Sequence, residues 1–75
     1  MIDNIPRGTV IEAVVDGRTL RRTVATTMFC DINEGYADIE FKDPEGNYGH
    51  YKSSYDKGRI IFPNGVVFDY NGARW

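Results

Sequence analysis

Short runs of β-branched and aromatic residues alternate with polar residues along this chain, and each run ends close to a glycine. Within the runs, apolar and polar side chains tend to alternate, which is the period of a half-buried β-strand. Glycine marks the turns because it adopts backbone conformations that other residues avoid. The pattern predicts strands near residues 9–15, 18–30, 36–43, 48–55, 59–62 and 66–70.

The second segment, residues 18–30, has two interpretations. Leu20, Val24 and Met28 fall at helical spacing, so a short helix is an open alternative. We prefer a strand because the segment is rich in β-branched threonine and valine, whose stiff side chains favour extended backbone.

The fold class predicted from this rhythm is all-β. The chain has 75 residues without an internal repeat or linker, so residues 1–75 form a single domain. We expect a small antiparallel barrel or a strongly curved sheet of five to six strands. Its strand number and length resemble those of Src-homology-3-like and OB-like barrels, a resemblance that concerns fold alone.

Two turns predict the registers of their hairpins. Asp16-Gly17 suits a two-residue loop with positive φ at both positions, which places Glu12 opposite Arg21 as an outward ion pair. The segment 43–46 has Asp first, Pro second and Gly fourth, as in a type I turn followed by a glycine bulge.

Counting back from the second turn places complementary charges opposite each other. Asp38 then faces Lys52, and Glu40 faces His50, both on the outer face. Tyr36 and Tyr48 belong to this face by alternation, whereas we expect the core to be filled by Phe41, Tyr51, Tyr55 and Phe68.

Asn64-Gly65 is a second candidate for a two-residue loop. That register places Phe62 opposite Val67, with Ile60 on the same face, while Ile61, Val66 and Phe68 point to the core. Both faces of this hairpin are then apolar. Either this hairpin crosses the interior of the barrel, or its outer face docks onto a partner or a second copy of the chain; we predict the docking.

The chain is slightly acidic overall, with a net charge of −2 and a pI of about 5.2. Acidic residues gather in the segment 31–45, and this composition disfavours binding to nucleic acid, whose affinity comes mainly from phosphate neutralisation. The arginines of 18–22 leave that function open as an alternative. Its candidate residues are Arg18, Arg22, Lys52, Arg59 and Trp75, with bases stacked on tyrosine or tryptophan.

Catalysis and metal binding find little support in the residue inventory. The chain has one cysteine and one histidine, and nothing in the sequence orients Cys30 towards His50 as a nucleophile and base. We expect Cys30 to be a small buried apolar residue and His50 to be a partner of Glu40. The segment 31–35 lacks the ligands of a calcium loop, so we expect no enzymatic activity, no metal and no cofactor.

The sequence therefore favours a non-catalytic protein-binding module. Aromatic residues on a polar face are typical of binding hot spots. The candidate residues are Tyr36, Asp38, Glu40, Tyr48, Ile60, Phe62 and Val67. A structural subunit of a larger assembly is a third hypothesis.

The sequence also suggests a cellular location and a kind of partner. A lone cysteine and no signal segment or long apolar run predict a cytoplasmic protein. Small proteins of this style are common among accessory proteins of phages and mobile elements. The partner on this hypothesis is a host or defence protein that the chain inhibits.

Overall fold

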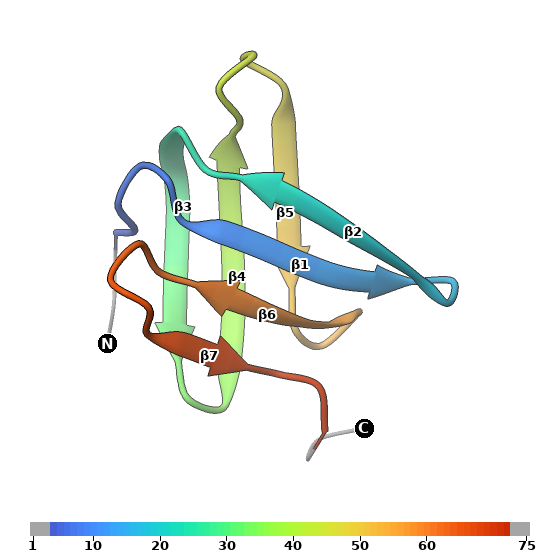
Figure 1. The fold of residues 1–75 in the computed structure, drawn as a ribbon. Coiled ribbons are helices and arrows are strands. Elements are labelled where there is room, and N and C mark those ends of the chain that lie inside the picture. Colours follow the sequence, from blue (N-terminus) through green and yellow to red (C-terminus); the bar gives the residue numbers. More distant parts are fainter. Residues whose placement is uncertain (1–3, 73–75) are drawn as a thin grey trace.

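The computed structural model describes residues 4–72, which form seven strands in two antiparallel sheets (Figure 1). One sheet has four strands in the order β2-β1-β6-β7, and the other has three in the order β3-β4-β5. The two sheets form layers whose strands cross steeply (Figure 1). The strands are β1 (Val10–Val15), β2 (Arg18–Thr23), β3 (Thr26–Asn33), β4 (Tyr36–Lys42), β5 (Tyr48–Lys52), β6 (Lys57–Ile61) and β7 (Val67–Asp69).

The all-β class is confirmed, but the predicted barrel or curved sheet of five to six strands is wrong, because the described residues form seven strands in two antiparallel sheets that do not close into a barrel. The predicted strand 18–30 divides into β2 and β3, and no part of it is helical. The Val24 amide donates to the Thr9 carbonyl at 2.8 Å, which continues the four-stranded sheet. The next amide, that of Ala25, donates to the Lys42 carbonyl at 2.8 Å in the other sheet. The chain therefore changes sheets between two adjacent residues.

The first two predicted hairpin registers are confirmed. Asp16 and Gly17 have φ values of 52° and 77°, as a two-residue hairpin loop requires, and Glu12 lies opposite Arg21. In the second hairpin, Asp38 lies opposite Lys52. The carboxylate of Asp43 organises that turn, because its Oδ1 accepts hydrogen bonds from the backbone amides of residues 45 and 47.

The register predicted for the third hairpin is wrong by one residue, since Ile61 lies opposite Val67 and not opposite Phe68. A two-residue Asn64-Gly65 loop would need a backbone N–H on Pro63 to close the hairpin, and proline has none. The loop instead includes Pro63, and the Gly65 amide donates to the carbonyl of residue 62 at 2.9 Å.

This shift exchanges the two faces of β6 and leaves Val67 and Phe68 of β7 on their predicted sides, because side chains alternate along a strand. Ile60 and Phe62 are buried in the core, with exposed fractions of 0 % and 9 %, so they are wrong as members of an exposed binding face. Val66, which was predicted to point inward, is exposed, whereas Val67 is exposed as predicted.

The core lies between the two sheets. Its buried apolar residues include Ile11, Ile32, Ile39, Phe41, Tyr51, Ile60, Phe62 and Tyr70, and the partly buried Phe68 packs against them. Cys30 is buried among them, as predicted. Tyr55 is not a core residue, because its side chain is largely exposed and its ring centroid lies 5.2 Å from Lys52 Nζ.

Candidate functional site

The outer face of the three-stranded sheet brings together four of the predicted binding residues. Along β4, Ala37, Ile39 and Phe41 are buried. The residues that alternate with them, Tyr36, Asp38 and Glu40, therefore point outward. Tyr48, His50 and Lys52 of β5 join them on this side.

Strand β3 adds two residues to this face that the sequence prediction missed. Phe29 lies opposite Glu40, and Asp31 lies opposite Asp38. Asp31 was missed because the predicted strand stopped at residue 30, whereas Phe29 lay inside that strand but was assigned to neither face. The alternation of buried Cys30 and Ile32 with these polar or exposed neighbours was the available signal. We call this surface the acidic face; it comprises Phe29, Asp31, Tyr36, Asp38, Glu40, Lys42, Tyr48, His50 and Lys52.

Side chains on the acidic face bond along diagonals rather than straight across. His50 Nε2 lies 2.7 Å from Asp38 Oδ1, although His50 is opposite Glu40 in the register. The Tyr48 hydroxyl donates to Glu40 Oε1 at 3.0 Å. The pKa of Tyr48 is raised by reduced contact with water and by this carboxylate. Two of the carboxylates are thus held in place by ring partners on β5.

Large apolar and aromatic groups are exposed beside these carboxylates. The side chains of Phe29 and Tyr48 have exposed fractions of 48 % and 54 %, and Met28, at a bulge in β3, is also exposed. The three carboxylates of the face are accompanied by His50 and by two lysines, Lys52 on β5 and Lys42, which follows Glu40 on the same side of β4. This arrangement can contact a protein surface through both rings and charge.

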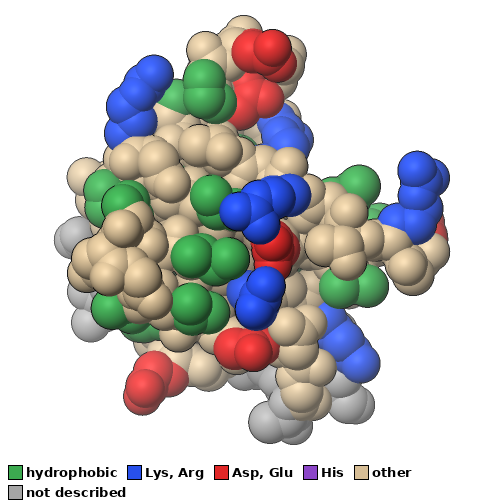
Figure 2. Space-filling view, viewed as in Figure 1, with side chains coloured by type: hydrophobic (Ala, Val, Ile, Leu, Met, Phe, Trp, Pro, Cys, Tyr) green, Lys and Arg blue, Asp and Glu red, His purple; other side chains and the backbone are tan. Residues whose placement is uncertain are grey.

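The opposite side of the molecule carries a neutral ladder of charges. Arg21, Glu12, Arg59 and Asp69 are successive cross-strand neighbours on the outer face of the four-stranded sheet. Glu12 forms ion pairs with both arginines, and the hydrogen bond from Arg59 in particular lowers the pKa of its carboxyl group. Figure 2 looks onto this side, where acidic and basic side chains lie next to each other.

An apolar row runs beside this ladder. Val10, Ile61 and Val67 are cross-strand neighbours, and Val66, which precedes Val67 in the sequence, is also exposed. Figure 2 shows hydrophobic side chains gathered on this side. Val67, with an exposed fraction of 45 %, is the one predicted member of the terminal-hairpin surface that remains on the outside.

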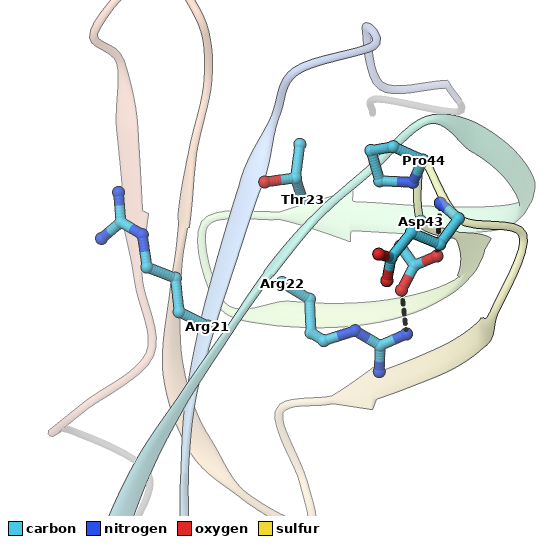
Figure 3. A pocket seen from close by; sticks show the side chains of 6 residues that line it. Arg21, Arg22, Thr23, Asp43 and Pro44 are labelled. Atoms are coloured by element: carbon cyan, nitrogen blue, oxygen red, sulfur yellow. Dashed lines mark hydrogen bonds and ion pairs between the residues drawn. The ribbon is translucent and has the colours of Figure 1, made fainter.

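The basic residues of the nucleic-acid alternative are not brought together. Arg22 reaches Asp43 Oδ2 at 3.0 Å and lies 5.5 Å from the centre of the Phe41 ring, so it belongs to the gap between the sheets. In Figure 3, Arg21 and Arg22 point to opposite sides of β2, around an open hollow that Thr23 and Pro44 also line.

The other basic candidates are scattered. Arg59 pairs with Glu12 on the four-stranded sheet, whereas Lys52 belongs to the acidic face, where Tyr36 and Tyr55 raise its pKa. Arg18 begins β2 at the tip of the first hairpin. Trp75 lies outside the described residues.

The residues weighed as a catalytic pair do not come together, and the described part of the chain holds no metal cluster. Cys30 points into the core and His50 points outward, so they do not meet as nucleophile and base. Within residues 4–72 there is no group of three His, Cys, Asp or Glu side chains that could hold a metal ion. The same residues include no helix with the length and apolarity needed to cross a membrane.

Comparison with protein-family models, curated proteins and solved structures gives no match for this chain. The functional assignment therefore depends on the surfaces described above.

Proposed function

We propose that this chain is a non-catalytic protein-binding module that presents its acidic face to a basic surface of another protein. The observation that carries the proposal is the mixture of three carboxylates, Asp31, Asp38 and Glu40, with the exposed side chains of Phe29 and Tyr48 on one side of a sheet. Rings supply contact area at low entropic cost, while the charges steer a cationic partner.

The rigid support of these side chains favours a binding role. Asp38 and Glu40 each lie between two buried residues of β4, so the packing of the core holds them in place. His50 and Tyr48 further fix Asp38 and Glu40 through hydrogen bonds of 2.7 and 3.0 Å. A pre-organised surface loses little side-chain freedom on binding, and this favours affinity.

The nucleic-acid alternative has weaker support. Arg21, Arg22 and Arg59 each pair with a carboxylate of the chain itself, and Lys52 stands among acidic groups. A phosphate backbone approaching any of them also meets a negative charge.

The third hypothesis is a structural subunit of a larger assembly. Such a subunit would use the same surfaces in permanent contacts. In the experiment that follows, it would be recognised by a stoichiometric complex that resists high salt.

The proposal is tested by comparing two variants with the same change in net charge. The first, Asp31→Asn, Asp38→Asn and Glu40→Gln combined, neutralises the acidic face. The second, Asp16→Asn, Glu34→Gln and Glu45→Gln combined, neutralises three exposed acids in turns. Each tagged variant and the native chain are used to capture partners from the native host, and the affinity of the main partner is measured at low and high salt.

We expect the face variant to bind its partner at least tenfold more weakly, with a smaller salt dependence, and the turn variant to bind like the native chain. Recovery of a host or defence protein would in addition support the hypothesis of an inhibitor. Equal affinities for both variants would exclude the acidic face as the binding surface. A labelled oligonucleotide that binds at low salt would favour the alternative.

A further inference from the structure

The outer face of the four-stranded sheet carries two parallel lines of side chains. Each strand contributes one residue to each line, in the order β2, β1, β6 and β7. The charge ladder reads Arg21, Glu12, Arg59 and Asp69 in this order, and the apolar row reads Thr23, Val10, Ile61 and Val67 once its threonine on β2 is included. We call the surface formed by these residues the ladder face; Figure 2 looks onto it.

The charges of the ladder alternate in sign from β2 to β7. Their order is positive, negative, positive and negative. Because the number of charges is even, the same ladder read from its other end has the opposite sign at every position. A second ladder that is turned end for end therefore places each charge over an opposite one. A two-fold symmetric contact between identical chains requires this kind of self-complementarity.

Each end of the ladder can form a further ion pair. The Arg21 side chain has an exposed fraction of 62 % and reaches Glu12, which Arg59 also binds, through Nη1. A guanidinium has five N–H donors, so Arg21 can bind a second carboxylate. At the other end, Asp69 Oδ1 accepts the Asn71 amide at 2.9 Å, and Asp69 has no ion pair within residues 4–72. The β2 end thus presents a positive charge and the β7 end a negative one.

The apolar row remains in contact with water in the single chain. Val67 has an exposed fraction of 45 %, and Val10 and Ile61 are partly exposed. Val66, the neighbour of Val67 in the sequence, is also exposed. Apolar side chains on three adjacent strands form a continuous patch, and covering such a patch stabilises an association.

We propose that a second copy of this chain packs against the ladder face, related by a two-fold axis that runs along the strands between β1 and β6. The rotation places β1 of one copy over β6 of the other, and β2 over β7. Arg21 then lies over Asp69 of the second copy, and Glu12 lies over its Arg59. By symmetry, each of these charge pairs forms twice.

The same rotation brings the two apolar rows together. Val10 lies over Ile61 of the second copy, and Val67 lies over its Thr23. The strands of the two sheets remain aligned, which is a usual arrangement for sheets that pack face to face. One operation therefore covers the apolar row and pairs every charge of the ladder.

The charges also decide the direction of the axis. A two-fold axis perpendicular to the strands, running along the ladder, would place Arg21 over its own equivalent and Glu12 over its own equivalent. Like charges in contact disfavour an interface. Of the two directions, only the axis along the strands joins opposite charges.

A second copy fits this surface better than a partner of uniform charge. A basic surface meets Arg21 and Arg59, whereas an acidic surface or a phosphate backbone meets Glu12 and Asp69. The chain itself carries the matching order of charges. A specific interface buries roughly 800 Å² on each partner, and the chain exposes 4628 Å², so covering about a sixth of its surface is enough. The acidic face, on the other sheet, remains free for a different protein.

The proposal is tested first on the native chain. Its mass is measured by sedimentation from micromolar to millimolar concentration, and the amide signals that shift with concentration are mapped by NMR. We expect a dimer at the higher concentrations, with shifts at Glu12, Arg59, Ile61 and Val67 and none at His50. A monomer at millimolar concentration, or shifts confined to other surfaces, would overturn the proposal.

Two variants with exchanged charges test the order of the ladder. In a dimer of Arg21→Glu, or in a dimer of Asp69→Arg, like charges meet at both ends of the interface. An equal mixture of the two variants restores opposite charges at both ends. We expect each variant alone to dimerise about tenfold more weakly than the native chain, or weaker still, and the mixture to form a heterodimer of nearly native affinity.

The matched controls are Arg18→Glu and Asp31→Arg, which change the net charge by the same amounts away from the ladder face. They should dimerise like the native chain, both alone and mixed. All variants are checked for a native-like amide spectrum. Val67→Lys, which places a charge in the apolar contact, is the second test if an exchanged variant does not fold, and it should also weaken the dimer.

The outcomes leave the proposed function separate from this inference. Native-like dimers of both exchanged variants, failure of their mixture to associate, or an unchanged dimer of folded Val67→Lys would overturn the two-fold arrangement. A host partner that still requires Asp31, Asp38 and Glu40 would leave the proposed function standing in each of these cases.

Discussion

Asp31 of β3 and Asp38 of β4 lie directly opposite each other on the acidic face. Like charges in this position destabilise a sheet. Replacing Asp31→Asn should raise the free energy of unfolding by a few tenths of a kcal/mol to about 1 kcal/mol, measured by chemical denaturation. The same change should weaken binding to a basic partner. Glu34→Gln, in the turn between these strands, serves as the control and should alter neither quantity; a less stable Asp31→Asn chain would contradict the prediction.

Gly58 allows β6 to pass close to its neighbours. A Cβ atom at this position would collide with the Glu12 carbonyl oxygen and approach the Tyr51 hydroxyl oxygen to 2.8 Å. Gly58→Ala should therefore lower the free energy of unfolding by about 1–3 kcal/mol, the usual cost of overpacking. Gly72→Ala is the matched control, because its Cβ would have no neighbour within 4 Å and should change stability by less than about 0.5 kcal/mol.

The register of the last hairpin predicts different effects for Phe62 and Val67. Phe62 is buried and its ring packs at 5.5 Å from that of Phe68, so Phe62→Ala should cost about 3–5 kcal/mol. Val67→Ala, on the outer face, should cost less than about 1 kcal/mol. Thermal melts of the two variants decide the register. Similar small losses for both would restore the register with Asn64-Gly65 as the loop.

Glu12 makes the stability of the folded chain depend on pH in the acidic range. Hydrogen bonding to Arg59, together with the charges of Arg59 and Arg21, lowers the pKa of this carboxyl group in the folded chain. Between the folded pKa and the ordinary value of 4.5, the unfolded chain binds more protons, so stability is present above 4.5 and is lost as the pH falls through the folded pKa. Unfolding curves of Glu12→Gln should show a weaker loss over this range, and an unchanged slope would contradict the assignment.

Tyr70 makes the stability of the folded chain decrease as the pH rises in the alkaline range. Burial raises its pKa from 10.0 to about 12. Between these values the unfolded chain releases a proton that the folded chain keeps, so stability is present below pH 10 and is lost as the pH rises through the folded value. Tyr70→Phe loses the hydrogen bond of 2.7 Å to the Asn33 carbonyl, which lowers stability at neutral pH by about 1 kcal/mol. Its stability should then fall less steeply in alkali than that of the native chain, as followed by denaturation at increasing pH.

The sequence by itself determined the β class and two of the hairpins, because turn chemistry acts over a few residues. Asp16-Gly17 needs positive φ at both positions, and Asp43 accepts bonds from the amides that follow it. Each turn then decides on which side of the sheet every side chain of its two strands lies. The outward position of Asp38 and Glu40 followed from this counting. The third register was also readable from local chemistry, since Pro63 has no N–H to close the shorter loop.

Only the tertiary structure decided how these hairpins share a core. The change of sheet between Val24 and Ala25 depends on partners at Thr9 and Lys42, far away in the sequence. That change created β3 and so brought Phe29 and Asp31 onto the acidic face. It also left β5 as an edge beneath the first hairpin. Burial of apolar surface is non-directional and is shared among all strands, so the order of strands in a sheet is chosen by the whole chain and not by any segment.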